Sequence, residues 1–201
     1  MEYKLKRRLI IGISIILLII LYIFKNYNFM IRIAGFLFGL WAFYFIDHAF
    51  YLKFKFRHYV YIFLILILGI LLSPLYHISE SYDKILHLAM PILASIMIFF
   101  IVNKMKIKFQ WKILITFTAV LSILALLEIG EYLFDMFLDF KLQGVYLRDI
   151  SGLEKYNLIL EKNDDTMIDM MLGFAGAIIF SISKSISYFY NKRHSKKIRD
   201  Y

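Results

Sequence analysis

LLEIGEYLFDMFLDF, residues 126–140, ends an apolar segment at 113–137 that is long enough to cross a lipid bilayer. The stretch nevertheless carries four carboxylates, at Glu128, Glu131, Asp135 and Asp139. On a helix these side chains fall within one stripe about 80° wide. Because a charge near the bilayer centre costs roughly a few kcal/mol, we expect the stripe to face other helices or a polar cleft rather than lipid.

The whole chain is apolar, with 61% hydrophobic residues among 201. A soluble domain is typically nearer half apolar, with short periodic runs in place of long blocks. Cysteine is absent, which excludes a disulfide framework, a thiolate metal site and a thiol nucleophile. No Gly/Ser-rich or Pro-rich linker divides the chain. The composition predicts an all-α, polytopic transmembrane helical bundle that forms one integral membrane domain over residues 1–201.

Six apolar blocks approach or reach the length of about 17–25 residues that a transmembrane helix needs. They lie at residues 9–24, 30–50, 59–73, 85–102, 113–137 and 166–189. The sequence therefore predicts about six spans, an outer loop at 138–165 and a basic cytoplasmic tail at 190–201. The first block follows the basic sequence KLKRR but lacks a small-residue cleavage site, so we interpret it as an uncleaved span.

Lysine and arginine predict the orientation of these spans. With both termini inside, the inner segments hold 16 of these residues and the outer segments hold seven. This bias follows the positive-inside rule and predicts an N-in/C-in protein of the cytoplasmic membrane. The basic inner face suits membrane lipids with anionic headgroups. Nucleic acid is not an expected partner, because the chain offers no soluble domain or basic-aromatic groove.

Polar residues recur where two other spans begin at the outer side. YDKILHL places Asp83 and His87 on one helix face at i and i+4, and NDDTMIDMM does the same for Asp165 and Asp169. Together with Glu128, these side chains are expected to converge near the outer leaflet. A simpler interpretation is also open, in which Asp83 only caps the fourth span and Asp164 or Asp165 only caps the sixth.

Such carboxylates cannot all stay ionised in a low dielectric without compensation by a divalent cation, shared protons or cationic side chains. Oxygen ligands with an imidazole suit Zn²⁺, Mn²⁺ or Mg²⁺. The residues expected to act in catalysis or to hold a divalent metal are His87, Glu128, Glu131 and Asp169. The residues expected to orient them or to bind substrate are Asp83, Lys84, Asp165 and Thr166. Asp135 and Asp139 are expected in the headgroup region, and Asp47 with His48 at the inner interface.

The order of three motifs resembles a known family. YDKILH at 82–87, an E-x-x-E at 128–131, and DT-x-x-DM at 165–170 followed by GFAGA resemble the YjdF-type inner-membrane proteins. Those proteins are similar in turn to the VanZ-like family. The resemblance implies a site formed by Asp83, Lys84, His87, Glu128, Glu131, Asp165, Thr166, Asp169 and Met170. The chain departs from the pattern of the YjdF-type proteins in the outer loop, where a longer stretch follows Gln143-Gly144.

Three classes of function remain open from the sequence. The first is an enzyme, such as a metal-assisted hydrolase or transferase, that acts on a lipid or cell-envelope precursor at an outward-facing site. The second is an ion- or proton-coupled transporter that uses the buried carboxylates. The third is a structural or regulatory membrane protein without catalysis, in which the cluster holds helices together.

Overall fold

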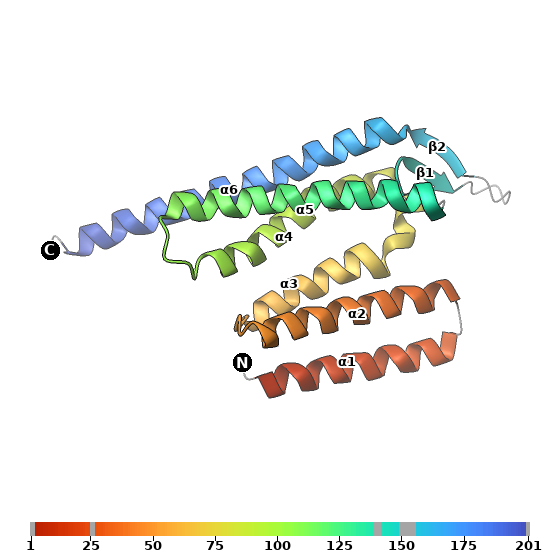
Figure 1. The fold of residues 1–201 in the computed structure, drawn as a ribbon, viewed down its shortest axis with the longest axis horizontal. Coiled ribbons are helices and arrows are strands. Elements are labelled where there is room, and N and C mark those ends of the chain that lie inside the picture. Colours follow the sequence, from red (N-terminus) through yellow and green to blue (C-terminus); the bar gives the residue numbers. More distant parts are fainter. Residues whose placement is uncertain (1–2, 25–26, 139–141, 149–155, 200–201) are drawn as a thin grey trace. The chain divides into compact units, whose positions relative to one another are not determined.

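The computed structural model describes residues 3–24, 27–138, 142–148 and 156–199. The chain folds as two compact units, Met1–Leu75 (unit 1) and Tyr76–Tyr201 (unit 2). Each unit is a group of helices, which confirms the all-α membrane class (Figure 1). The sequence predicted one integral membrane domain over residues 1–201. That prediction depends on how the two units combine, so it stays a prediction.

Unit 1 contains α1 (Tyr3–Phe24), α2 (Tyr27–Ala49) and α3 (Phe56–Leu66). The last helix continues into a π-helical turn, Ile67–Leu71, and a 3-10 helix, Ser73–His77, leads into unit 2. α2 packs against both α1 and α3. Its buried apolar residues form the centre of the unit and recur at three- and four-residue spacing: Ile33, Phe36 and Leu40.

An ion pair lies inside unit 1. Nζ of Lys6 is 2.6 Å from Oδ2 of Asp47, and the two side chains are 1% and 0% exposed. The Tyr59 hydroxyl donates to the same oxygen at 2.6 Å, and the Phe54 N–H donates to Oδ1 at 3.1 Å. The sequence placed Asp47 at an interface and Lys6 among the inner-face charges. Instead, the fold buries both because each neutralises the other.

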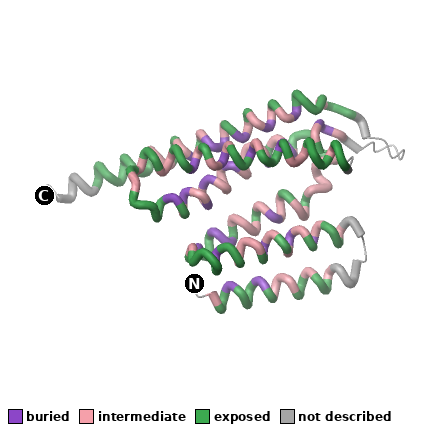
Figure 2. The backbone as a smooth tube through the Cα atoms, viewed as in Figure 1, coloured by how far each residue is buried: buried purple, intermediate pink, exposed green. Residues whose placement is uncertain are grey.

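Unit 2 contains α4 (Glu80–Val102), α5 (Phe109–Leu138) and α6 (Lys162–Arg199), with a hairpin of β1 (Val145–Arg148) and β2 (Tyr156–Leu160). α4 packs against both α5 and α6, and α5 also contacts α6. Figure 2 shows buried positions recurring along α4 and α6, and a largely exposed α5. The residues that α5 buries are four apart on one face: Thr116, Val120, Leu124 and Glu128.

Two glycines of α6 allow close helix contact. A Cβ on Gly176 would lie 2.5 Å from the Leu88 carbonyl oxygen of α4, and one on Gly173 would lie 2.5 Å from the Leu124 side chain of α5. The small residues of GFAGA therefore form a helix-packing segment. The close approach matters for function because it brings the first turns of α6 next to those of α4.

Four helices are long and apolar enough to cross a membrane, at Phe29–Ala49, Glu80–Val102, Phe109–Phe137 and Lys162–His194. They correspond to the second, fourth, fifth and sixth predicted spans. The third predicted span falls on a shorter apolar helix, Phe56–Leu71. The first falls on α1, whose residues 3–20 include four Lys and Arg. The count of six spans therefore stays a prediction, as does the N-in/C-in orientation.

The structure adds detail at two predicted boundaries, whose place in the membrane stays a prediction. The outer loop at 138–165 contains the antiparallel β1–β2 hairpin, in which Tyr146 pairs with Leu158. The strand sequences VYLR and YNLIL are rich in aromatic and branched apolar residues, which favour paired β-strands. α6 begins at Lys162 rather than at 166 and continues through the predicted tail to Arg199. The tail is helical because it contains no proline or glycine to end the helix.

Candidate functional site

The predicted site residues come together at one end of unit 2. The start of α4, the end of α5, the hairpin and the start of α6 all lie there (Figure 1). Both α4 and α6 begin at this end. The first eight residues of α4 include Asp83, Lys84 and His87. The first eight residues of α6 include Asp165, Thr166 and Asp169. α5 adds Glu128 and Glu131 near its end. The sequence thus predicted the convergence of three helices.

Lys84 is the centre of the acidic part of the cluster. Its ammonium lies 3.0 Å from Oδ2 of Asp83 and 2.8 Å from Oδ1 of Asp169, and it also pairs with Oδ1 of Asp165. One lysine therefore bridges α4 and α6 through three carboxylates. The sequence placed Lys84 among the residues that orient the site or bind substrate, and in this arrangement its three N–H donors are directed at protein carboxylates.

His87 faces the second oxygen of two of these aspartates. Its Nε2 lies 3.4 Å from Oδ1 of Asp83 and 3.8 Å from Oδ2 of Asp169. Its Nδ1 lies 3.7 Å from Oε1 of Glu128, which is too far for a hydrogen bond. Asp83 and Asp169 therefore present one oxygen to Lys84 and the other to the imidazole.

Two buried polar atoms of the cluster have no hydrogen-bond partner among the described residues, Nδ1 of His87 and Oε2 of Glu128. Glu128 is only 7% exposed, while the neighbouring Leu127 and Ile129 are more than half exposed. α5 thus turns Glu128 inward and its apolar residues outward, as expected from the stripe. A buried polar atom without a partner is costly, so these two atoms mark a place that suits a ligand, an ion or water.

The segment before the hairpin also reaches the cluster. The backbone N–H of Gly144 donates to Oδ2 of Asp165 at 2.8 Å, and the Gln143 amide lies 3.3 Å from the Thr166 hydroxyl. The described hydrogen bonds of the Asp165 carboxylate therefore join α6 to α4 and to this segment. They do not cap the helix to which Asp165 belongs, so the simple capping interpretation does not hold for this residue.

Asp135 has a role that the sequence did not predict. Its Oδ1 accepts from the Leu142 N–H at 2.6 Å, and its Oδ2 accepts from the Gln143 N–H at 3.1 Å and from Lys162 at 3.0 Å. It therefore anchors the segment that follows α5 and holds it near the start of α6. Such long-range backbone contacts leave no signal in helical periodicity. Asp139, the last acid of the stripe, lies outside the described residues.

Tyr76 is a further neighbour that sequence reasoning missed. It lies before α4, and its ring meets that of Tyr82 edge-on at 5.4 Å. Burial raises the pKa of the Tyr76 phenol, and the charges of Asp83 and Glu131 raise it further. The phenol therefore stays protonated at neutral pH and can donate a hydrogen bond. The surrounding apolar sequence, SPLYH, gave no reason to select it.

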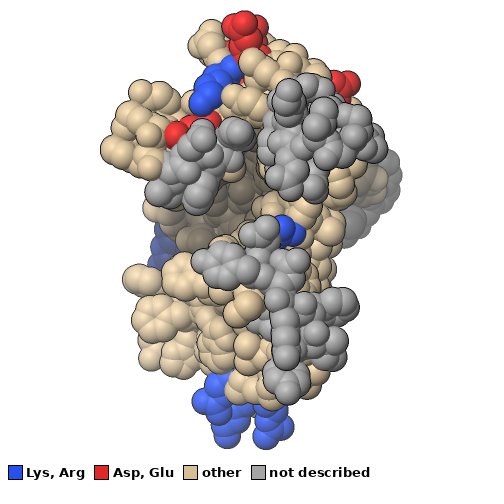
Figure 3. Space-filling model, turned by 90° about the vertical axis from the view of Figure 1, so that its right-hand side faces the viewer, with Lys and Arg blue, Asp and Glu red and all other residues tan. Residues whose placement is uncertain are grey.

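A groove of about 450 Å³ opens beside the cluster, between α4, the hairpin and α6. Its walls are mainly apolar, with Leu88 and Leu172 from the two helices and Ile159 from the hairpin, and Lys84 also lines it. Figure 3, which looks at the hairpin end of the molecule, shows acidic and basic atoms at a few places on a surface of mostly other residues. The site therefore combines a buried charged centre with an apolar approach.

The geometry also accommodates a cation. Asp83, His87 and Asp169 can each offer one ligand atom, and these atoms lie within 4.8 Å of one another. The residues predicted as metal ligands were His87, Glu128, Glu131 and Asp169. The group that the structure brings together contains His87 and Asp169 from that set and adds Asp83. Glu128 lies next to the imidazole of His87 but is not part of the group. Glu131 lies on the same helix, three residues after Glu128, and no hydrogen bond or ion pair links it to the described residues.

Comparison with curated proteins finds no match, and comparison with solved structures finds none either. A family described as "Predicted membrane protein (DUF2238)" matches residues 7–190, which cover most of both units and every residue of the cluster. The match agrees with the apolar helices that are long enough to cross a membrane. The chain therefore belongs to this family of membrane proteins, DUF2238.

Proposed function

We propose that the cluster is the centre of a metal-assisted hydrolase or transferase that acts on a lipid or cell-envelope precursor. The observation that carries the proposal is the position of Asp83, His87 and Asp169, whose ligand atoms lie within 4.8 Å of one another. An imidazole and two carboxylate oxygens suit Zn²⁺, Mn²⁺ or Mg²⁺. A divalent ion held there supplies Lewis-acid assistance and an activated water for an ester or phosphoryl group.

The surrounding residues have separate roles in this proposal. Glu128 and Glu131 act as general base and acid, since Oε2 of Glu128 is buried without a hydrogen-bond partner among the described residues. Lys84 balances the carboxylates and lines the groove, so it holds the acidic residues in place where the polar end of the substrate enters. Asp165 and Thr166 orient Lys84 and the segment at Gln143.

The apolar groove supports a substrate with a hydrocarbon chain. A chain packed against Leu88, Ile159 and Leu172 would bring its polar end to Lys84, beside the cluster. A water-soluble substrate would gain little from such walls, because burial of apolar surface requires an apolar ligand.

We further propose that the protein is a YjdF-type member of its family with a VanZ-like site, located in the cytoplasmic membrane. The meeting of the three motifs in one cluster supports this assignment, since Lys84 of the first motif binds Asp165 and Asp169 of the third. In the N-in/C-in orientation, the cluster would face outward, where envelope precursors are handled.

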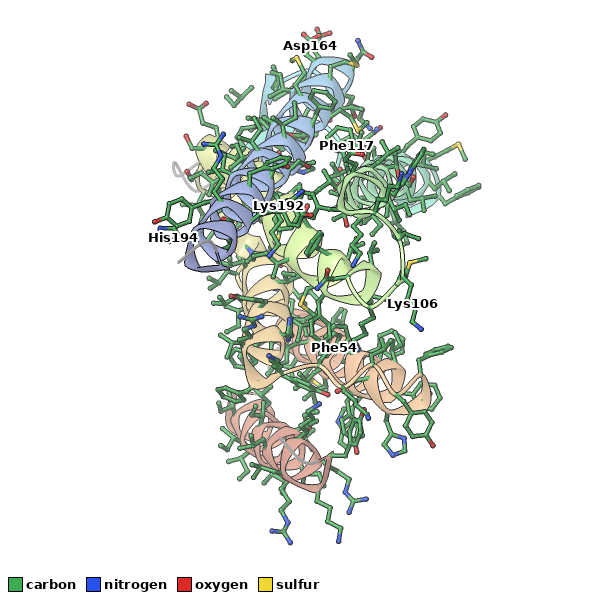
Figure 4. The ribbon with its side chains drawn as sticks, turned by 90° about the vertical axis from the view of Figure 1, so that its left-hand side faces the viewer. Phe54, Lys106, Phe117, Asp164, Lys192 and His194 are labelled. Carbon is green, nitrogen blue, oxygen red and sulfur yellow. The ribbon has the colours of Figure 1, made fainter. Side chains whose placement is uncertain are left out.

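Metal analysis of the detergent-purified full-length protein tests the proposal. After equilibration with Zn²⁺, Mn²⁺ or Mg²⁺ and removal of excess ion, we expect about one ion per chain for the wild type. His87→Ala and Asp169→Asn should each lower the metal affinity by at least about tenfold. The matched control is Asp164→Asn, because Asp164 is exposed in the first turn of α6 and points outward (Figure 4).

Wild-type protein that retains none of the three metals would exclude metal-assisted chemistry. One observation then favours ion- or proton-coupled transport. Lys84 occupies the carboxylates as a tethered cation, so a transported cation could compete with it for Asp83 and Asp169. Proton or Na⁺ flux in proteoliposomes, lost in Asp169→Asn, would support that alternative.

A further inference from the structure

The end of unit 2 opposite the carboxylate cluster contains a second pocket, of about 470 Å³. Its walls come from the end of α4, the connection that follows it, the start of α5 and the later part of α6. Three lysines line it, Lys108, Lys112 and Lys184. Polar and apolar side chains share the rest of the lining.

The charge of this pocket is unbalanced. None of the residues that line it is acidic, and the sequence contains no Asp or Glu at residues 85–127 or 170–199. These ranges include the parts of α4, α5 and α6 that surround the pocket. Three lysines without a nearby carboxylate create a positive site that favours an anion.

Two of the lysines are held in place. Lys112 donates to the backbone oxygen of Asn103 at 2.8 Å and to its side-chain oxygen at 3.1 Å. Nζ of Lys184 lies 4.8 Å from the centre of the Phe99 ring. These contacts hold one cation on α5 and one on α6 and reduce the entropy cost of binding an anion.

The pocket lies where two of the candidate spans have their ends. Glu80–Val102 stops beside Asn103, and Phe109–Phe137 begins at Phe109. The Phe109 ring stacks on Tyr188 of α6 with centroids 3.8 Å apart, which gives the pocket an aromatic wall. Aromatic rings and lysines at the end of a span are typical of headgroup depth in a bilayer. The lysines can therefore meet a lipid phosphate while its chains follow the helices.

We propose that this pocket binds the phosphate of an anionic phospholipid, such as phosphatidylglycerol. Lys108, Lys112 and Lys184 surround the phosphate, and the aromatic wall contacts the glycerol and the upper part of the chains. Basic pockets between membrane helices are known to hold such headgroups. The site is separate from the carboxylate cluster and does not depend on the function proposed for it.

The test measures the shift in melting temperature of the detergent-purified full-length protein with three additives: dioctanoyl phosphatidylglycerol, dioctanoyl phosphatidylcholine and inorganic phosphate. We expect half-maximal stabilisation by phosphatidylglycerol at a concentration at least about tenfold below that of phosphatidylcholine. Lys108→Gln and Lys184→Gln should each weaken the effect about fivefold, the factor that corresponds to roughly 1 kcal/mol per cation. Lys184→Arg should retain it.

Lys106→Gln is the matched control. Lys106 lies on the same connection between α4 and α5, is exposed, does not line the pocket and points outward in Figure 4. Equal loss in Lys106→Gln would show diffuse surface charge instead of a site. Wild-type behaviour of both glutamine variants, or equal stabilisation by phosphatidylcholine, would overturn the proposal. Full competition by inorganic phosphate would show a site for a free anion instead of a lipid. If Lys184→Gln does not fold, Lys108→Gln and Lys184→Arg decide the result.

Discussion

Lys6 in unit 1 and Lys84 in unit 2 are both held by aspartates, but their surroundings differ. Lys6 meets one carboxylate, Asp47, and both oxygens of Asp47 have further partners in Tyr59 and Phe54. Lys84 meets three carboxylates, and the nearby Glu128 and His87 each keep a buried polar atom without a hydrogen-bond partner among the described residues. The charges of Lys6 and Asp47 balance each other, whereas the carboxylates around Lys84 outnumber the lysine.

The difference supports the proposal that the Lys6–Asp47 cluster is structural and that the cluster around Lys84 is functional. A balanced, fully hydrogen-bonded ion pair holds helices together and offers no capacity for a ligand. An excess of buried acid is unfavourable for folding alone, which supports the proposal that an ion, a proton or a substrate completes the cluster. Burial by itself does not distinguish the two clusters, because both are largely shielded from solvent.

The largest expected effect on stability is in the balanced cluster. Lys6→Met leaves Asp47 buried without its cation, which should lower the free energy of unfolding by about 3–5 kcal/mol. Thermal unfolding of the purified protein measures this change. The double variant Lys6→Met/Asp47→Leu should recover much of the loss, since it removes both charges. Lys4→Met is the control, because Lys4 is exposed on the same helix. Equal melting temperatures for Lys6→Met and Lys4→Met would contradict the structural role.

A smaller effect is expected from the packing that brings α4 to α6. Gly176→Ala places a Cβ 2.5 Å from the Leu88 carbonyl oxygen, so the helices must separate, at a cost of about 1–3 kcal/mol. Separation should also weaken metal binding, because Asp83 and Asp169 lie on different helices. Gly130→Ala is the matched control, as a Cβ there meets nothing within 4 Å. It should stabilise α5 by up to about 1 kcal/mol through helix propensity. A Gly176→Ala protein as stable as the wild type would show that the close approach is not required.

The smallest effect on stability is expected in the unbalanced cluster. Glu131→Gln keeps the size of the side chain but removes one of several crowded acids, so the melting temperature should stay unchanged or rise. The metal content should persist, because Glu131 is not among the three close ligands, while turnover should fall by about 100-fold or more if it transfers a proton. A fall in stability comparable to that of Lys6→Met would make this cluster structural as well.

Much of the architecture follows from the sequence by itself. Long apolar blocks determine a helical membrane protein, since only helices satisfy every backbone group within such a segment. The i,i+4 spacing of Asp83 with His87 and of Asp165 with Asp169 determines that each pair shares a face. The apolar flanks of Glu128 require that it turn inward. These properties depend only on helical geometry and on the cost of burying charge.

Only the tertiary structure decided which charges meet. The sequence treated Lys6 as a topology charge and Asp47 as interfacial, yet the fold joins them across α1 and α2. It could not show that Lys84 would bind Asp165 and Asp169 on α6. It also gave no sign that Asp135 would anchor the segment after α5, or that a hairpin would form in the predicted loop. These contacts join residues far apart in the chain, so they depend on how closely the helices approach, which Gly176 sets at one point, and not on local periodicity.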